Sequence, residues 1–68
     1  MKIKIDKEAD AAYIYFKDIV PGEVKKTISL NDSINIDLDE NDKTIGIEIL
    51  DASKNLPNFD MQTQSINQ

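Results

Sequence analysis

NIDLDENDKTIGIEIL, residues 35–50, is the stretch that decides the fold of this chain. Apolar and polar residues alternate on both sides of Asn41-Asp42, which is the period-two pattern of β-strands. Pairing the two halves across Asn41-Asp42 sets Leu38 opposite Ile45, Ile36 opposite Ile47 and Ile34 opposite Ile49. A slip of one residue would turn every isoleucine to solvent, so burial specifies this register. The stretch therefore predicts a β-hairpin.

The same stretch also partly matches a calcium-binding loop. Asp37, Asp39, Asn41 and Glu48 occupy positions 1, 3, 5 and 12 of the loop template. However, Asp42 stands where the template needs Gly for a sharp turn, and the flanks are alternating β-branched runs rather than amphipathic helices. We prefer the plain hairpin, in which Asp37 and Asp39 lie side by side on the polar face. Weak metal or small-ligand binding at Asp37, Asp39 and Glu48 remains an alternative.

Further segments show the same alternation and extend the sheet. Residues 2–5 and 13–17 predict a wide hairpin, Pro21-Gly22 marks the connection to a third strand at 24–30, and residues 31–33 turn into the fourth. Asp51 can cap a short helical stretch that ends before Pro57. The predicted fold is mainly β, bordering on α+β: a twisted antiparallel five-strand meander with a short C-terminal helical segment. We assign residues 1–56 to one domain and 57–68 to a polar, flexible tail.

All the predicted strands place apolar side chains on one face of the sheet. The residues of this core or oligomer face include Ile14, Phe16, Ile28, Ile36, Leu38, Ile45, Ile47 and Ile49. At about 1.5–3 kcal/mol for each fully buried side chain, such a face cannot stay in contact with water. A chain of 68 residues without cysteine has few other means of covering it. We therefore expect a homo-oligomer, most simply a dimer.

Charge and composition narrow the classes of partner. The chain has 13 acidic and 8 basic residues and a net charge of −5, which repels phosphate backbones and anionic lipids. We expect no direct nucleic-acid binding. Residues 1–10 alternate charge with isoleucine, and no apolar run approaches the ~20 residues of a membrane span, so the expected compartment is the cytoplasm, without membrane attachment.

Tyrosines and lysines share the polar face of the first two strands. Tyr13 and Tyr15 lie there with Lys2, Lys4 and Lys17. Aromatic rings among cations can stack nucleobases. Cross-strand Lys and Tyr pairs also stabilise a solvated sheet face, and the net charge favours that interpretation. The candidates for contact with a partner protein are thus Asp37, Asp39, Glu48, Tyr13 and Tyr15.

Catalysis is not indicated by the residue types present. The chain contains neither Cys nor His, and no Ser, Thr or Lys has a sequence context typical of an activated nucleophile. We expect a protein that is not an enzyme and that needs no cofactor.

Two stretches carry a resemblance to a known family. KIKIDKEADAAYIYF at residues 2–16 and IDLDENDKTIGIEILDAS at residues 36–53 resemble the DUF2283 family of small bacterial and archaeal proteins, and the likeness extends from Lys2 to about Lys54. The family has no established activity. Some members are thought to lie beside genes for toxin-like proteins, which implies an antitoxin-like role. Family members usually have Asp-Gly or Asn-Gly where this chain has Asn41-Asp42, so the second hairpin is expected to open to a four-residue loop.

These observations together predict a small, non-catalytic binding or adaptor protein. Its acidic face would bind a basic partner protein such as a toxin, because opposite charges steer association. A purely structural oligomerising domain is the other alternative.

Overall fold

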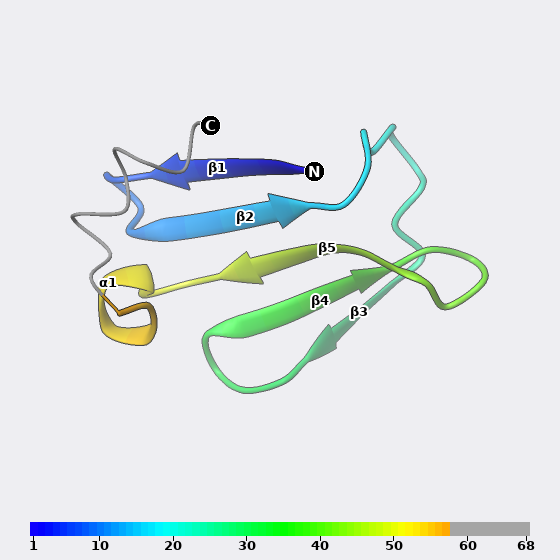
Figure 1. Cartoon of the computed structure of the whole chain (residues 1–68). Coiled ribbons are helices and arrows are strands. Elements are labelled where there is room, and N and C mark those ends of the chain that lie inside the picture. The colour runs from blue at the N-terminus through cyan, green and yellow to red at the C-terminus, as the bar shows by residue number, and fades with distance from the viewer. Residues whose placement is uncertain (58–68) are drawn as a thin grey trace.

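The hairpin predicted from residues 35–50 is present in the computed structural model, which describes residues 1–57 of the chain (Figure 1). Strand β4 spans Ile34–Leu38 and strand β5 spans Thr44–Ile49. Ile36 lies opposite Ile47, and Ile34 opposite Ile49. This part of the register is confirmed, because it keeps every isoleucine on one face.

The predicted register is wrong at the end of the hairpin next to the turn. Leu38 lies opposite Thr44 instead of Ile45, because the pairing shifts between Asp37 and Leu38. The turn is wider than two residues, as expected, but five residues rather than four separate the strands, because β4 ends at Leu38 and β5 begins at Thr44. In this turn the Asp39 N–H donates to the Lys43 carbonyl oxygen at 3.0 Å.

The other strands complete one antiparallel sheet. Strands β1 (Lys2–Asp6), β2 (Ala11–Tyr15) and β3 (Lys26–Ser29) join the hairpin in the order β1-β2-β5-β4-β3. The mainly β class with five antiparallel strands is confirmed. The strand order is not that of the predicted meander, because β2 pairs with β5 instead of β3. In addition, β3 is shorter than the predicted strand at residues 24–30. The exposed, polar β3 suits an edge, whereas the isoleucine-rich β5 suits the centre.

The register aligns isoleucines across the whole sheet. One row contains Ile3, Ile14, Ile47, Ile36 and Ile28, one residue from each strand. We call this side the apolar face. Leu38, Ile45 and Ile49 are buried on it, whereas Phe16 and Ile28 are each 46% exposed. Burial is therefore uneven, and one part of the face remains in contact with solvent among the described residues.

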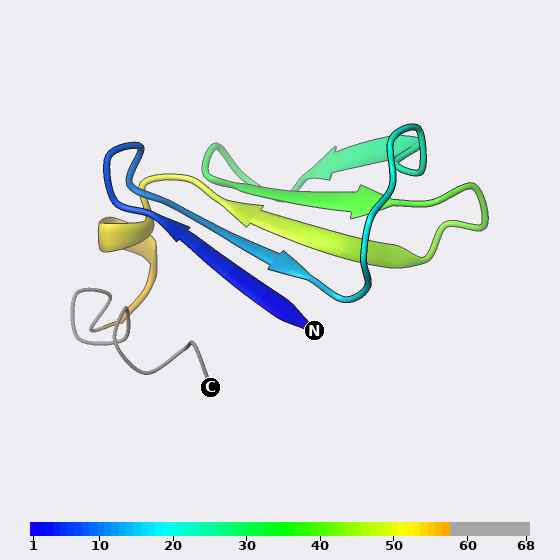
Figure 2. The same cartoon turned by 90° about the horizontal axis from the view of Figure 1, so that it is seen from above.

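Helix α1 (Ala52–Asn55) covers one end of the apolar face. Ala52 belongs to the core cluster with Ala12 and Ile49, and Leu56 packs against that cluster. Figure 2 shows the helix on one side of the sheet and the loop after β2 on the other.

The expected cap of this helix is wrong. The Asp51 side chain makes no capping hydrogen bond, and its backbone adopts the left-handed conformation at φ 48°. Asp10 supplies the cap instead: its carboxylate accepts hydrogen bonds from the Ser53 N–H at 3.0 Å and the Ser53 hydroxyl at 2.7 Å. The predicted tail begins at residue 57, and positions 58–68 lie outside the described residues.

Candidate functional site

The side of the sheet opposite the apolar face, here called the polar face, carries the candidate site residues. The first row across it pairs Lys4 with Tyr13, Tyr13 with Glu48 and Glu48 with Asn35. The second row is Lys2, Tyr15, Gly46, Asp37 and Thr27. Cations therefore lie at the β1 edge and carboxylates at the β4 and β5 side, because alternate residues of each strand share a face.

The three candidate carboxylates do not form one cluster. Asp37 accepts a hydrogen bond from the Thr27 hydroxyl at 2.7 Å, and Glu48 accepts one from the Asn35 amide at 3.1 Å. Asp39 does not lie beside Asp37 on the polar face, which corrects the arrangement expected from the sequence. The register shift after Asp37 moves Asp39 into the turn.

Asp39 stabilises the turn between β4 and β5. Its carboxylate accepts the backbone N–H groups of Asn41 at 2.8 Å and Lys43 at 2.9 Å. The bond from the Lys43 N–H is the main reason why the pKa of Asp39 lies below its ordinary value; the bond from the Asn41 N–H adds to the effect. This carboxylate is therefore engaged by its own loop.

The stretch that matched a calcium loop has the geometry of a hairpin. β4 and β5 flank the turn, where a calcium loop would join two helices. Asp42, at the position of the template Gly, has φ 61°. Within residues 1–57, no three acidic side chains come close enough to hold a metal ion.

The two tyrosines stand side by side on the polar face. The rings of Tyr13 and Tyr15 are parallel within 6°, and their centroids are 6.3 Å apart. Lys4 pairs with Tyr13 across the first hairpin, and Lys2 with Tyr15, as the sequence predicted. Rings and ammonium groups thus form one patch at the β1 edge.

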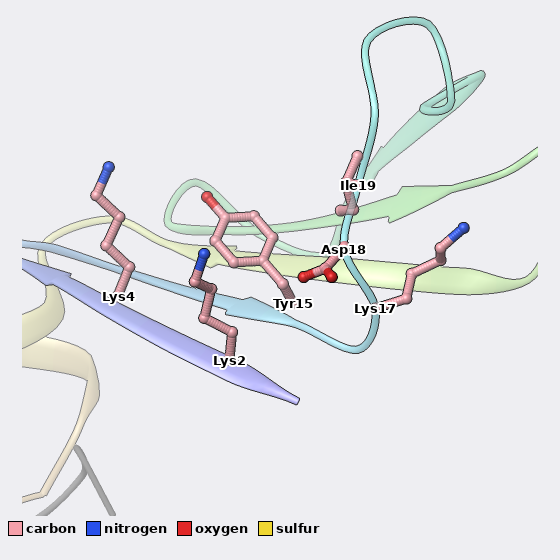
Figure 3. Close-up of a pocket in the computed structure, with 6 residues that line it drawn as sticks. All are labelled: Lys2, Lys4, Tyr15, Lys17, Asp18 and Ile19. Carbon is pink, nitrogen blue, oxygen red and sulfur yellow. The ribbon is translucent and has the colours of Figure 1, made fainter.

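A shallow hollow of about 590 Å³ lies over this patch (Figure 3). Lys2 and Lys4 rise on one side of Tyr15, and Asp18 and Ile19 stand on the other. The last two belong to the loop after β2, which the sequence interpretation treated only as a connection. Gly46 is the sequence feature that could have indicated this packing, because a residue without a side chain leaves space on the polar face for Ile19.

A second contact holds the same loop. Lys17 forms an ion pair with Glu23, and the other oxygen of Glu23 accepts the Val20 N–H at 3.1 Å. The hydrogen bond from Lys17 is the main reason why the pKa of Glu23 is lowered; the Val20 N–H contributes next. Glu23 thus connects Lys17, at the start of the loop, with Val20 in its middle.

Asp10 and Ser53 were missed as a structural pair by the sequence interpretation. Both residues lie in the stretches that carry the family resemblance, but 43 positions separate them. No local pattern reports a contact at that separation. The contact arises because α1 packs beside β2 in the fold.

Residues 1–57 define a class of fold: one small antiparallel sheet with a single short helix and two faces of opposite polarity. Residues 2–53 match the DUF2283 family, described as a protein of unknown function, and the chain belongs to this family. The resemblance predicted from the sequence is thereby confirmed.

A curated relative supports this assignment. The chain is 45% identical over 65 residues to an uncharacterized protein of Methanocaldococcus jannaschii, a match that covers 90% of this chain and 53% of the relative. The chain thus spans about half the length of the curated relative it matches. No solved structure matches this chain. No helix in residues 1–57 has the length and apolar character needed to cross a membrane.

Proposed function

We propose that this chain is a non-catalytic protein-interaction module that pairs with a second copy through its apolar face. One observation carries the proposal: a row of five isoleucines crosses all five strands, while α1 covers only one end of that face in residues 1–57. Ile28 is 46% exposed and Leu30 is 65% exposed. Burying such side chains stabilises a complex by removing apolar surface from water.

A second copy is the occupant that best matches this surface. The exposed part of the face consists of aliphatic and aromatic side chains, so its partner must also be apolar. Its corner carries the charged pair Lys26 and Asp42, 3.2 Å apart. Two such sheets can pack face to face about a two-fold axis, so that each copy covers the other with the same patch.

Sedimentation equilibrium over a range of micromolar concentrations tests the proposal. We expect a mass of twice 7.7 kDa. Mixing isotope-labelled with unlabelled protein should then give intermolecular contacts between the methyl groups of Ile28 and Ile36. A mass of 7.7 kDa at all concentrations would contradict the pairing.

A finer part of the proposal concerns a partner protein. A dimer formed through the apolar face would leave Asp37 and Glu48 on the opposite side, where a basic partner such as a toxin can approach. This supports an antitoxin-like or adaptor role. Co-expression with the product of the neighbouring gene tests it: combined Asp37→Asn and Glu48→Gln should weaken co-purification, whereas Glu40→Gln in the exposed loop should not. Equal recovery with both variants would remove the acidic face from the proposal.

A further inference from the structure

The hollow on the polar face depends on a glycine of the neighbouring strand β5, which lets the loop after β2 approach the sheet. A Cβ atom at Gly46 would lie 3.4 Å from the Ile19 Cδ1 atom and 3.4 Å from the Ile14 carbonyl oxygen. The missing side chain therefore lets Ile19 pack directly on β5. As a result, the loop after β2 stands beside Tyr15 and forms a wall of the hollow (Figure 3).

One aromatic ring, that of Tyr15, lines the hollow, and a second ring supports it. Tyr15 lines it, and Tyr13 stands parallel to Tyr15 with a centroid distance of 6.3 Å. Both side chains are partly exposed. A partly exposed ring held upright by a neighbouring ring offers a fixed surface on which a planar aromatic ligand can stack.

The charges around the rings favour an anion. Lys2, Lys4 and Lys17 line the hollow, with Asp18 as its acidic member. Lys17 is held by Glu23 and points away from Tyr15 (Figure 3). Among residues 1–57, Lys2 and Lys4 form no ion pair, and they stand two positions apart on the same side of β1. Their ammonium groups are therefore free to bind a phosphate between them.

We propose that this hollow binds a small ligand in which a planar aromatic ring carries a phosphate, as in a mononucleotide. The ring would stack on Tyr15 against the wall at Ile19, and the phosphate would contact Lys2 and Lys4. A single nucleotide fits the charge pattern better than a long strand does. Glu48 lies next to Tyr13 in the first row, and Asp37 lies beyond Gly46 in the second, so a longer polyanion would meet carboxylates.

Titration of the isotope-labelled full-length protein with adenosine monophosphate tests the proposal. We expect saturable amide shifts at Lys2, Lys4, Tyr15 and residues 17–19, with a dissociation constant in the range of about 0.1–1 mM. Adenosine keeps the aromatic ring but lacks the phosphate, and ribose 5-phosphate keeps the phosphate but lacks the ring. Each should therefore bind about tenfold more weakly than the nucleotide.

Substitutions with opposite expected signs sharpen the test. Lys2→Gln and Lys4→Gln should each weaken binding about threefold to tenfold, and Tyr15→Leu about tenfold. Asp18→Asn should tighten binding, because it removes the negative charge from the hollow. Lys54→Gln is the control, because Lys54 lies on α1 away from the polar face. The amide spectrum of each variant shows whether it remains folded.

Several outcomes would overturn the proposal. Absence of saturable shifts at about 10 mM nucleotide would show that the hollow has no such ligand. If ribose 5-phosphate bound as tightly as the nucleotide, the hollow would be an unspecific anion site. If Lys54→Gln weakened nucleotide binding as much as Lys2→Gln or Lys4→Gln does, the effect would come from the net charge of the protein. Because the hollow lies on the face opposite the proposed dimer surface, its failure leaves the proposed function untouched, and the converse holds as well.

Discussion

Three aspartates adopt a backbone conformation that most residues avoid. Asp10, Asp42 and Asp51 have φ values of 52°, 61° and 48°. Aspartate tolerates the left-handed region better than most side chains because it can hydrogen-bond locally. The three residues nevertheless differ in what their side chains do: Asp10 caps α1, Asp42 pairs with Lys26, and Asp51 makes no capping bond. Substitutions can therefore separate backbone cost from side-chain contact.

Replacing Asp42 by Gly should stabilise the protein. Gly adopts φ 61° without steric cost, and this gain exceeds the added entropy of the unfolded chain, giving about 0.5 kcal/mol in the free energy of unfolding. The lost ion pair with Lys26 is exposed on both sides and contributes little. Thermal unfolding should show a melting temperature higher by about 2–4 °C. Asp42→Asn, which also tolerates this φ, is the control; an equal gain there would assign the effect to charge.

The lowered pKa of Asp39 predicts a loss of stability in acid. A carboxylate whose pKa is lower in the folded state stabilises the fold fully above its unfolded pKa of about 3.9, and this contribution disappears as the pH falls through the folded pKa. Asp39→Asn keeps an acceptor for the Asn41 and Lys43 N–H groups but does not titrate. Its melting temperature should therefore fall less than that of the wild type below about pH 4. If the melting temperatures of both proteins fell in parallel as the pH is lowered, other carboxylates would be the main cause of the acid instability.

At the scale of elements, alternation was enough to predict the strands but not their order. Isoleucines at every second position identify β4 and β5 and most of their register, and Pro21-Gly22 marks the loop after β2. The pairing of β2 with β5 and the contact of Asp10 with Ser53 join segments far apart in the sequence, so no local pattern reports them. The candidate site was predicted in part. Tyr13 and Tyr15 lie where expected, whereas Asp39 does not, because a bulge moved it into the turn.

The β4–β5 hairpin should not respond to calcium. Its turn is closed by Asp39, whose carboxylate already accepts two backbone N–H groups, and strands rather than helices flank it. Millimolar calcium at physiological salt should leave the amide spectrum of residues 37–48 essentially unchanged. Saturable shifts with a dissociation constant below about 10 µM, the upper limit for sensor loops, would instead indicate a true metal site.

Helix α1 offers a matched pair of substitutions. Asp10 and Asp51 have nearly the same φ, so replacing either by Gly costs nothing in backbone strain. Asp10→Gly also removes two hydrogen bonds to Ser53 and should destabilise the protein by about 1 kcal/mol, lowering the melting temperature by about 4–8 °C. Asp51→Gly removes no capping bond and should be neutral or stabilising. If Asp51→Gly instead lowered the melting temperature more than Asp10→Gly did, Asp51 would be the residue that caps the helix.

At the scale of the whole molecule, the apolar face raises the question of what covers it. Five aligned isoleucines, with α1 at one end only, form a sheet of one layer in the described part of the chain. The free energy available from burying the rest of the face is large relative to the stability of so small a domain. Residues 58–68 of the predicted tail lie outside the described residues, and their deletion is therefore an informative variant.

A charge placed on the rim of the apolar face should separate the copies without unfolding them. Ile28 lies on the edge strand β3 and is 46% exposed, so Ile28→Lys should leave the single chain folded. In a two-fold dimer the substitution occurs twice, and the loss of two buried isoleucines should weaken association by about 100-fold or more. Thr27→Lys adds the same charge on the opposite face of the same strand and should leave the mass doubled. Lysine at Ile36, in the middle of the sheet, should unfold the chain or split the dimer.

Sedimentation equilibrium of these variants, together with a chain truncated after residue 57, distinguishes the ways in which the apolar face can be covered. If a second copy covers it, the wild type, Thr27→Lys and the truncated chain should all sediment as dimers, while Ile28→Lys should sediment at 7.7 kDa with a dispersed amide spectrum. A wild-type monomer that begins to associate only after truncation would show that the chain covers its own face. A monomer in every case, with slow amide exchange in all five strands, would mean that the exposed isoleucines are tolerated in water, and that the sheet owes its stability to the core around Ala12, Ile49 and Ala52.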